Sequence, residues 1–223
     1  MQEKNITQYR RELYDRILDA ALDLFVRHGV RAVKMDDIAA ELSISKRTLY
    51  ELYANKEVLL FECVKRNREQ KRRELDAFAS EPGRTVMDIV LYIYKVGVSE
   101  SARTNRLFYD DLAKYPEVVN FLTRDKASSQ QQFRRFLQRG VNEGFFRADI
   151  NYDLIIHLFE AIGSYMNSHS LYQQYTSEEL FRNMIFVSLR GFCTEKGIRI
   201  LDENVFSSTG EKVELLKDIK VNE

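Results

Sequence analysis

The fold of this chain is decided by residues 29–60, which read GVRAVKMDDIAAELSISKRTLYELYANKEVLL. Residues 35–42 predict a short helix, because two aspartates near its start complement the helix dipole. A tight turn is expected at 43–45, and the apolar spacing of residues 46–53 predicts a second short helix. Two short helices joined by a tight turn are typical of a helix-turn-helix, which we place at 38–53.

Longer helices are expected on both sides of this motif. The preceding helix has apolar residues at three- and four-residue steps, and Gly29 ends it. The residues of that apolar face are Ile17, Ala20, Ala21, Leu24 and Phe25. After the motif, Asn55 can cap a helix that continues to about Phe78. The motif and the helix before it therefore form a three-helix unit of the kind that binds DNA.

The rest of the sequence predicts further amphipathic helices. They are expected over 84–101, 105–113, 116–139, 151–168 and 177–195, with a connector bracketed by Gly140 and Gly144. Thr176 and Glu179 have the spacing of a capping box, which supports the start of the last of these helices. We expect an all-α fold of about nine helices. The predicted divisions are a helix-turn-helix domain at 1–56, a larger helical domain at 57–203 and a polar tail at 204–223.

Composition narrows the class of protein further. The formal net charge is +0, so any contact with nucleic acid must come from a local patch. Cys63 and Cys193 lack metal-site or redox-motif spacing, which favours buried free thiols in a reducing compartment. A leader peptide and apolar runs of about 18 residues are not evident, so we expect a cytoplasmic protein, at the nucleoid if it binds DNA. Hydrolase, metalloprotease and phosphate-loop motifs are also missing; we expect no enzyme, no cofactor and no metal.

The second short helix carries the residues that we expect to contact DNA. Leu49, Leu52 and Tyr53 share one face, so this face packs inward. The opposite face presents Arg47 and Tyr50, and such a helix lies in the major groove with its N-terminal residues at the base edges. The predicted DNA-binding residues are Lys34, Ser45, Lys46, Arg47, Thr48, Tyr50 and Lys56, of which Lys34 and Lys56 flank the helix and neutralise phosphates.

This stretch resembles the N-terminal domain of the TetR family of bacterial transcriptional regulators. The matching residues are Gly29, Ile38-Ala39, Ile44-Ser45, Thr48-Leu49-Tyr50, Tyr53 and Lys56-Glu57. A weaker match is GVNEGFFRADI at 140–150, which is similar to the turn between the family's seventh and eighth helices. The resemblance implies a repressor that binds a pseudo-palindromic operator in double-stranded DNA as a homodimer and is released by a small-molecule effector.

Several positions depart from the family pattern. Ser43 stands where the family usually has Gly, so it must accept or avoid a positive φ. Val33 and Lys34 replace threonines, so a lysine contact replaces a hydroxyl contact with phosphate. Glu51 can face cytosine amino groups or repel phosphates. Basic residues recur over 65–73, but acidic residues interleave with them, which favours a solvated helix face over a DNA-binding patch.

The later helices are implied to bind a ligand and to form the dimer. The residues predicted to line a ligand pocket are Tyr92, Phe108, Phe133, His157 and Phe159, although core packing accounts for most of the aromatic residues in this region. His157 and Glu160 are too few for a metal site. The dimer is expected to form through 151–168 and 177–195. The alternative is an effector-independent DNA-binding dimer, whose C-terminal helices serve only assembly.

Overall fold

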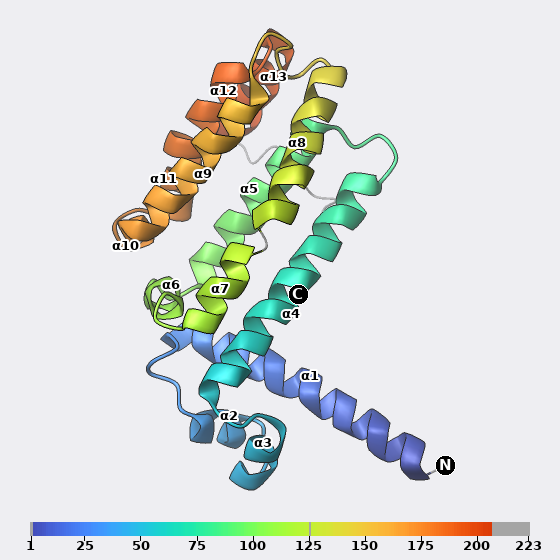
Figure 1. Ribbon diagram of the computed structural model, residues 1–223, viewed down its shortest axis with the longest axis vertical. Helices are drawn as coiled ribbons and strands as arrows, with labels where there is room; N and C mark the ends of the chain where they lie inside the picture. The colour runs from blue at the N-terminus through green and yellow to red at the C-terminus, as the bar shows by residue number, and fades with distance from the viewer. Residues whose placement is uncertain (1, 125, 207–223) are drawn as a thin grey trace.

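The computed structural model describes residues 2–124 and 126–206, and the secondary structure in these ranges is helical apart from one isolated bridge between Phe146 and Cys193. The N-terminal helices are α1 (Gln2–His28), α2 (Met35–Glu41), α3 (Lys46–Leu52) and α4 (Lys56–Ser80). Figure 1 shows α2 and α3 at one end of an elongated molecule, with α1 crossing the N-terminal part of α4. Helix α4 extends from this end into the body of the protein. The all-α prediction is confirmed.

Side-chain caps fix where α3 and α4 begin. The Ser45 hydroxyl accepts a hydrogen bond from the backbone N–H of Thr48 at 3.0 Å, at the start of α3. The Asn55 side chain accepts one from the backbone N–H of Val58 at 3.0 Å, so its predicted role as the cap of α4 is confirmed. Each cap satisfies a backbone donor that the first helical turn leaves without a partner.

The larger body is built from the remaining helices. They are α5 (Val86–Arg103), α6 (Leu107–Leu112), α7 (Pro116–Arg124), α8 (Lys126–Asn142), α9 (Tyr152–Ser168), α10 (Leu171–Gln174), α11 (Ser177–Leu180), the π-helix Phe181–Phe186, α12 (Val187–Phe192), α13 (Glu195–Leu201) and the π-helix Asp202–Phe206. Figure 1 shows α9 and α11–α13 packed together at the far end from α2 and α3.

The helical segments outnumber the nine predicted for identifiable reasons. The π-helix joins α11 to α12 without a break, so one predicted helix is divided into three segments. Helices α7 and α8 occupy the range predicted for a single helix, on either side of residue 125. Helices α10 and α13 were not predicted. The predicted tail at 204–223 lies, from residue 207 onward, outside the described residues, and Val205 in its first part is buried.

One predicted connector residue lies inside a helix. Gly140 was expected to begin the connector before Gly144, but α8 continues through it to Asn142. A Cβ atom at position 140 would overlap the ring of Phe146, so only glycine lets the ring pack against this helix. Gly144, with φ of +75°, follows the end of α8. The sequence suggested a break because glycine is usually a helix breaker, whereas here it allows close packing.

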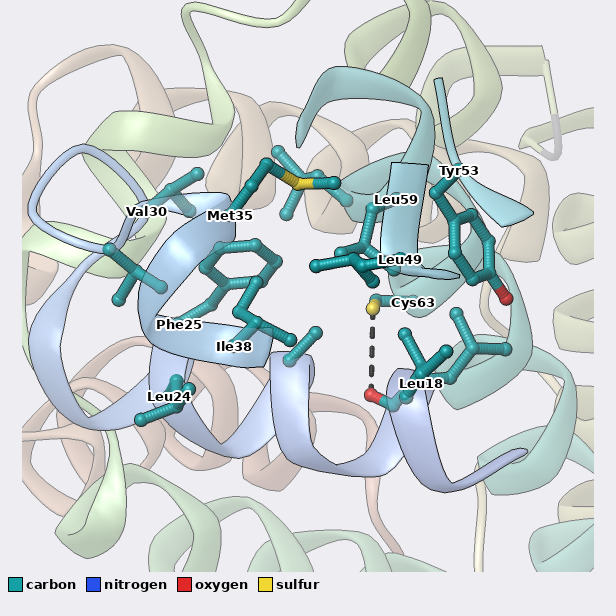
Figure 2. Close-up of a cluster of buried hydrophobic side chains, with 14 of the residues drawn as sticks. Leu18, Leu24, Phe25, Val30, Met35, Ile38, Leu49, Tyr53, Leu59 and Cys63 are labelled. Atoms are coloured by element: carbon teal, nitrogen blue, oxygen red, sulfur yellow. Dashed lines mark hydrogen bonds between the residues drawn. The ribbon is translucent and has the colours of Figure 1, made fainter. Parts of the chain in front are cut away.

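Two hydrophobic clusters form the core. The first joins α1–α4, and Figure 2 shows Phe25, Ile38, Leu49 and Leu59 meeting at its centre. Cys63 lies in the same cluster, with its thiol 3.5 Å from the carbonyl oxygen of Leu18. Phe108 and Val118, from α6 and α7, complete this cluster from the other side. The N-terminal helices therefore share their core with the body.

The second cluster joins α5, α8, α9 and the last helices. Its fully buried members include Val86, Leu137 and Leu201, and Cys193 is buried beside them. Both cysteines are free and buried, as predicted, and burial raises the pKa of each thiol to about 12. A buried neutral thiol behaves as a small apolar side chain. Neither cysteine is therefore a candidate reactive site.

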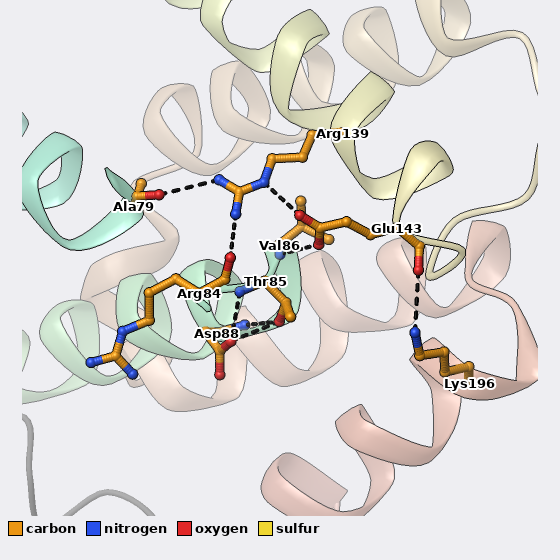
Figure 3. Close-up of polar contacts among 8 residues, drawn as sticks. All are labelled: Ala79, Arg84, Thr85, Val86, Asp88, Arg139, Glu143 and Lys196. Carbon is orange, nitrogen blue, oxygen red and sulfur yellow. Dashed lines mark hydrogen bonds and ion pairs between the residues drawn. The ribbon is translucent and has the colours of Figure 1, made fainter. Parts of the chain in front are cut away.

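Arg139 joins three helices at the junction between α4 and α5 (Figure 3). Its guanidinium donates to the carbonyl oxygens of Ala79 and Arg84, and at 2.6 Å to Glu143. Glu143 in turn accepts from the backbone N–H of Val86 at 2.8 Å, at the start of α5. Hydrogen bonds to charged groups are among the stronger ones in proteins. This network holds the end of α4 and the start of α5 against α8.

Candidate DNA-binding surface and ligand cavity

Helix α3 buries one face and exposes the other. Leu49 is fully buried, and the ring of Tyr53 packs edge-on against Tyr14 with centroids 5.6 Å apart. On the opposite face, the Arg47 side chain is 88% exposed and Tyr50 is 49% exposed. An exposed aromatic ring beside a guanidinium suits contact with base edges and sugars. The structure therefore places both residues on the exposed face of α3.

The cations of this face have carboxylate partners nearby. Lys46 Nζ lies 2.5 Å from Asp36 Oδ2 on α2, and this hydrogen bond raises the pKa of Lys46. Arg47 Nε donates to Glu51 Oε1 at 2.8 Å. Exposed ion pairs contribute only about 0–1 kcal/mol, so phosphate or base contacts can replace them. Sequence reasoning missed Asp36, because its position beside Lys46 depends on how α2 packs against α3.

Lys34 and Lys56, the two predicted phosphate contacts beside α3, differ in their surroundings. Lys34 is exposed at the start of α2, where its backbone N–H donates to Asp37 at 2.7 Å. Lys56 is half-buried, and its ammonium donates to the carbonyl oxygens of Val30 and Val33, each at 2.9 Å. Burial lowers the pKa of Lys56. Two of its three donors thus hold the loop before α2.

The turn between α2 and α3 contains a serine in the left-handed conformation. Ser43 has φ of +52°, so of the two alternatives expected for this position the chain accepts a positive φ. A non-glycine residue in this region is strained by its Cβ atom. In the same segment, the hydroxyls of Ser45 and Thr48 lie 2.8 Å apart, so both side chains take part in capping α3. Ser45 is exposed and Thr48 is half-buried.

Arg66 and Lys71, in the basic run over 65–73, form interhelical ion pairs. Arg66 on α4 binds Asp15 at 2.9 Å and also Asp19, both on α1. Lys71 on α4 binds Glu100 on α5 at 2.6 Å. These contacts fasten α4 to its neighbours. They agree with the interpretation that this run is a helix face rather than a surface for DNA.

A cavity of about 1050 Å³ lies among α6, α7, α8, α9 and α10. Its wall is formed by Tyr109, Asp110, Leu112, Ala113, Lys114, Val119, Leu122, Gln130, Phe133, Ile156, Phe159, Glu160, Gly163, Ser164, Ser168, Ser170 and Tyr172. Phe133 and Phe159, which the sequence analysis predicted as pocket residues, meet there edge to face with centroids 5.6 Å apart. Mostly apolar walls with a few polar groups are typical of small-molecule sites.

The other predicted pocket residues lie elsewhere. Tyr92 stacks on Phe78 with ring centroids 4.4 Å apart, and Phe108 belongs to the N-terminal core cluster. His157 is exposed, and its Nδ1 lies 3.3 Å from Glu160. Within the described ranges, no group of three or more His, Cys, Asp and Glu side chains could hold a metal ion. The sequence identified the aromatic residues but not the side of each helix that faces the cavity.

Helix α6 contacts both the cavity and the N-terminal helices. Asp111 is buried, and its Oδ2 accepts from the backbone N–H of Arg31 at 2.9 Å, in the loop between α1 and α2. Just before α6, Asn105 donates through its backbone N–H to the carbonyl oxygen of Val26 at 2.7 Å. Lys114 Nζ, at the cavity wall, lies 3.2 Å from Asp111 Oδ1. A single short helix therefore links the cavity to the loop that leads into the helix-turn-helix.

An apolar stripe follows the outer face of α9. Leu154, Leu158 and Tyr165 are exposed at intervals of four and seven residues, and Val187 is exposed on α12. Residues at this spacing share one helix face. A contiguous exposed apolar surface is typical of a protein interface, whereas scattered single residues are not. The stripe lies on one of the two helical regions that the sequence analysis assigned to the dimer, and Val187 lies on the other.

A capped helix-turn-helix with an exposed cationic and aromatic face, on an all-helical body, defines a transcriptional regulator of the helix-turn-helix class. Residues 17–63 match the family model of bacterial regulatory proteins of the tetR family. Residues 17–63 are therefore similar to the N-terminal domain of the TetR family of bacterial transcriptional regulators.

Individual relatives agree with this assignment. The chain is 28% identical to the HTH-type transcriptional repressor KstR2 of Rhodococcus jostii (strain RHA1), over 62% of this chain and 70% of the relative. In fold it is similar to a transcriptional regulator from Saccharomonospora viridis solved in complex with choline, with a TM-score of 0.66, 16% identity and coverage of 83% and 100%. A TetR regulator from Chloroflexus aurantiacus J-10-FL gives a TM-score of 0.60 at 17% identity, covering 82% and 96% of the two chains. Among the described helices, none is long and apolar enough to span a membrane.

Proposed function

We propose that this regulator is a homodimeric repressor that binds a pseudo-palindromic operator through α3 and leaves it when a small molecule occupies the cavity. The observation that carries the proposal is the double contact of α6. Its residues line the cavity, while Asp111 on the same helix holds the loop before α2. A ligand that favours a different position of α6 shifts the orientation of the helix-turn-helix, and so shifts the population that fits DNA.

The proposed DNA contacts fall into two groups. Lys46, Arg47 and Tyr50 face the major groove, and their present carboxylate partners are exposed and replaceable. The second group contacts backbone phosphates around the helix. It consists of Ser45, Thr48, Lys34 and the remaining donor of Lys56. Base contacts set the sequence preference, whereas phosphate contacts set affinity for all sequences.

The proposed dimer forms through α9 and α11–α12. The exposed stripe of Leu154, Leu158 and Tyr165 on α9 supports this interface. Two-fold pairing would set the two α3 helices roughly 34–36 Å apart, one turn of DNA. The pseudo-palindromic symmetry of the operator then mirrors the symmetry of the dimer.

Binding of purified protein to genomic fragments, including those that flank its own gene, tests the function. We expect selective retention of a few fragments; uniform binding at every fragment would refute the proposal. Arg47→Ala should change which fragments are preferred. Lys34→Ala should weaken binding to all fragments alike. It should also lower the slope of log affinity against log salt concentration by about one unit. Lys34 is a cleaner choice than Lys56, whose ammonium also holds the α1–α2 loop.

The effector arm of the proposal is tested separately. The Saccharomonospora viridis regulator was solved with choline, so this fold accommodates a small organic ligand in at least one protein. A metabolite panel should contain compounds that raise the melting temperature of this protein and release its operator. If no compound raises the melting temperature or releases the operator, the effector-independent dimer becomes the better description.

A further inference from the structure

We propose that the N-terminal part of α1 forms a second contact with DNA, in which Arg10 and Arg11 bind backbone phosphates beside the site that α3 reads. This second contact rests on the proposed DNA binding by α3. Helix α1 begins at Gln2, but Leu13 is its first buried residue among those described. The side chains described before Leu13 are all exposed, and they are Gln8, Arg10, Arg11 and Glu12. This arm, residues 8–12, therefore extends past the hydrophobic core.

The arm lies at the end of the molecule that carries the helix-turn-helix. Figure 1 shows the N-terminal end of α1 at the same end as α2 and α3. The ring of Tyr14 packs edge-on against Tyr53, which directly follows α3, with centroids 5.6 Å apart. Arg10 precedes Tyr14 by four residues, so the two share a helix face and lie about 6 Å apart along the helix axis. Arg10 is therefore on the side of α1 that meets the helix-turn-helix, one turn beyond that contact.

The two guanidinium groups of the arm have no carboxylate within ion-pair distance among the described residues. The acidic residues that follow on α1 are used by α4, because Asp15 and Asp19 both bind Arg66. Glu12, inside the arm, accepts from the side-chain amide of Gln8 at 3.1 Å. The two cations of α3, by contrast, are each paired with a carboxylate. DNA can therefore bind the arm without displacing an ion pair of the protein.

Phosphate is the ligand that the arm fits. A guanidinium presents five N–H donors in a planar fork that matches the oxygen atoms of a phosphate group. The formal net charge of the chain is +0, so attraction to DNA depends on local clusters such as this pair. Phosphate contacts carry no sequence information, so the arm adds affinity while α3 sets the sequence preference. The arm precedes residues 17–63, so the family match does not extend to this contact.

The first test measures binding to a mixed-sequence DNA duplex by fluorescence anisotropy over a range of salt concentrations. Replacing both arginines, Arg10→Gln with Arg11→Gln, should lower the slope of log affinity against log salt concentration by about two units per bound subunit. Affinity at low salt should fall by about tenfold or more. Arg10→Lys with Arg11→Lys keeps both charges and should keep the slope. The control, Arg135→Gln with Arg199→Gln, removes two exposed cations from α8 and α13 and should leave the slope unchanged.

The position of the contact is tested on a fragment that the protein retains selectively from genomic DNA. As base pairs are trimmed from both ends, wild-type affinity should fall before selectivity is lost, because the flanking phosphates are removed first. The glutamine variant should not respond to this early trimming, since it lacks the side chains that reach those phosphates. Equal sensitivity of the two proteins would contradict a contact outside the α3 site.

An unchanged salt slope in the glutamine variant, an equal fall in the control, or failure of the wild-type chain to bind the duplex would each overturn the proposal. A lower slope in the glutamine variant, without preference for any genomic fragment, supports the arm and refutes the operator function. Selective retention of fragments with an unchanged slope does the reverse. The substituted positions are exposed, so all variants should melt at the wild-type temperature.

Discussion

The link between α6 and the loop before α2 can be tested by removing the carboxylate of Asp111. Its side chain is 7% exposed, and it accepts from the Arg31 backbone N–H at 2.9 Å and pairs with Lys114 at 3.2 Å. In Asp111→Ala the Arg31 amide loses a charged acceptor, which costs about 1.5–3 kcal/mol. The half-exposed pair with Lys114 adds about 0–1 kcal/mol, and the better helix propensity of alanine returns roughly 0.5 kcal/mol.

The free energy of unfolding should therefore fall by about 1–3.5 kcal/mol, measured by urea denaturation followed by circular dichroism. Asp110→Ala is the matched control, because it makes the same substitution at the neighbouring position, which faces the cavity. The amide hydrogen of Arg31 should also exchange faster with solvent in Asp111→Ala than in the control. If both variants unfold at the same urea concentration and Arg31 exchanges equally in each, the coupling role assigned to Asp111 is wrong.

Three further changes test how the fold is held. Gly140→Ala should lower the free energy of unfolding by about 1–3 kcal/mol through overlap with Phe146, whereas Gly191→Ala, which meets open space, should not; equal thermal melting of the two variants would contradict the packing argument. Ser43→Gly should raise stability by up to about 1 kcal/mol, since relief of the left-handed strain exceeds the added entropy of the unfolded chain; a lower urea midpoint would contradict this. Both cysteines should resist a disulfide reagent at about pH 8 in the folded protein and react in urea, because burial raises each thiol pKa to about 12 and only the thiolate reacts; rapid labelling without urea would show that they are accessible.

The sequence by itself determined the DNA-binding unit. The turn before Ser45, the cap at Asn55 and the inward residue Leu49 are local features, set by hydrogen bonds and apolar spacing within a few residues. The family match at residues 17–63 falls on the same stretch. The helix content of the chain followed from the three- and four-residue spacing of its apolar residues. The capping box at Thr176 also formed as predicted, because the backbone N–H of Thr176 lies 2.8 Å from the Glu179 carboxylate.

Only the tertiary structure decided which residues meet across the chain. Asp111 and Arg31 are 80 positions apart, and their hydrogen bond depends on where α6 lies. The periodicity of α9 did not reveal that Phe159 would face a cavity while His157 would face solvent, because both sit on an amphipathic helix whose packing partners are distant in sequence. Gly140 was misassigned for the same reason, since its role depends on the ring of Phe146 returning against α8. Local free energies fix helices and caps, whereas cavities and links between helices arise from long-range packing.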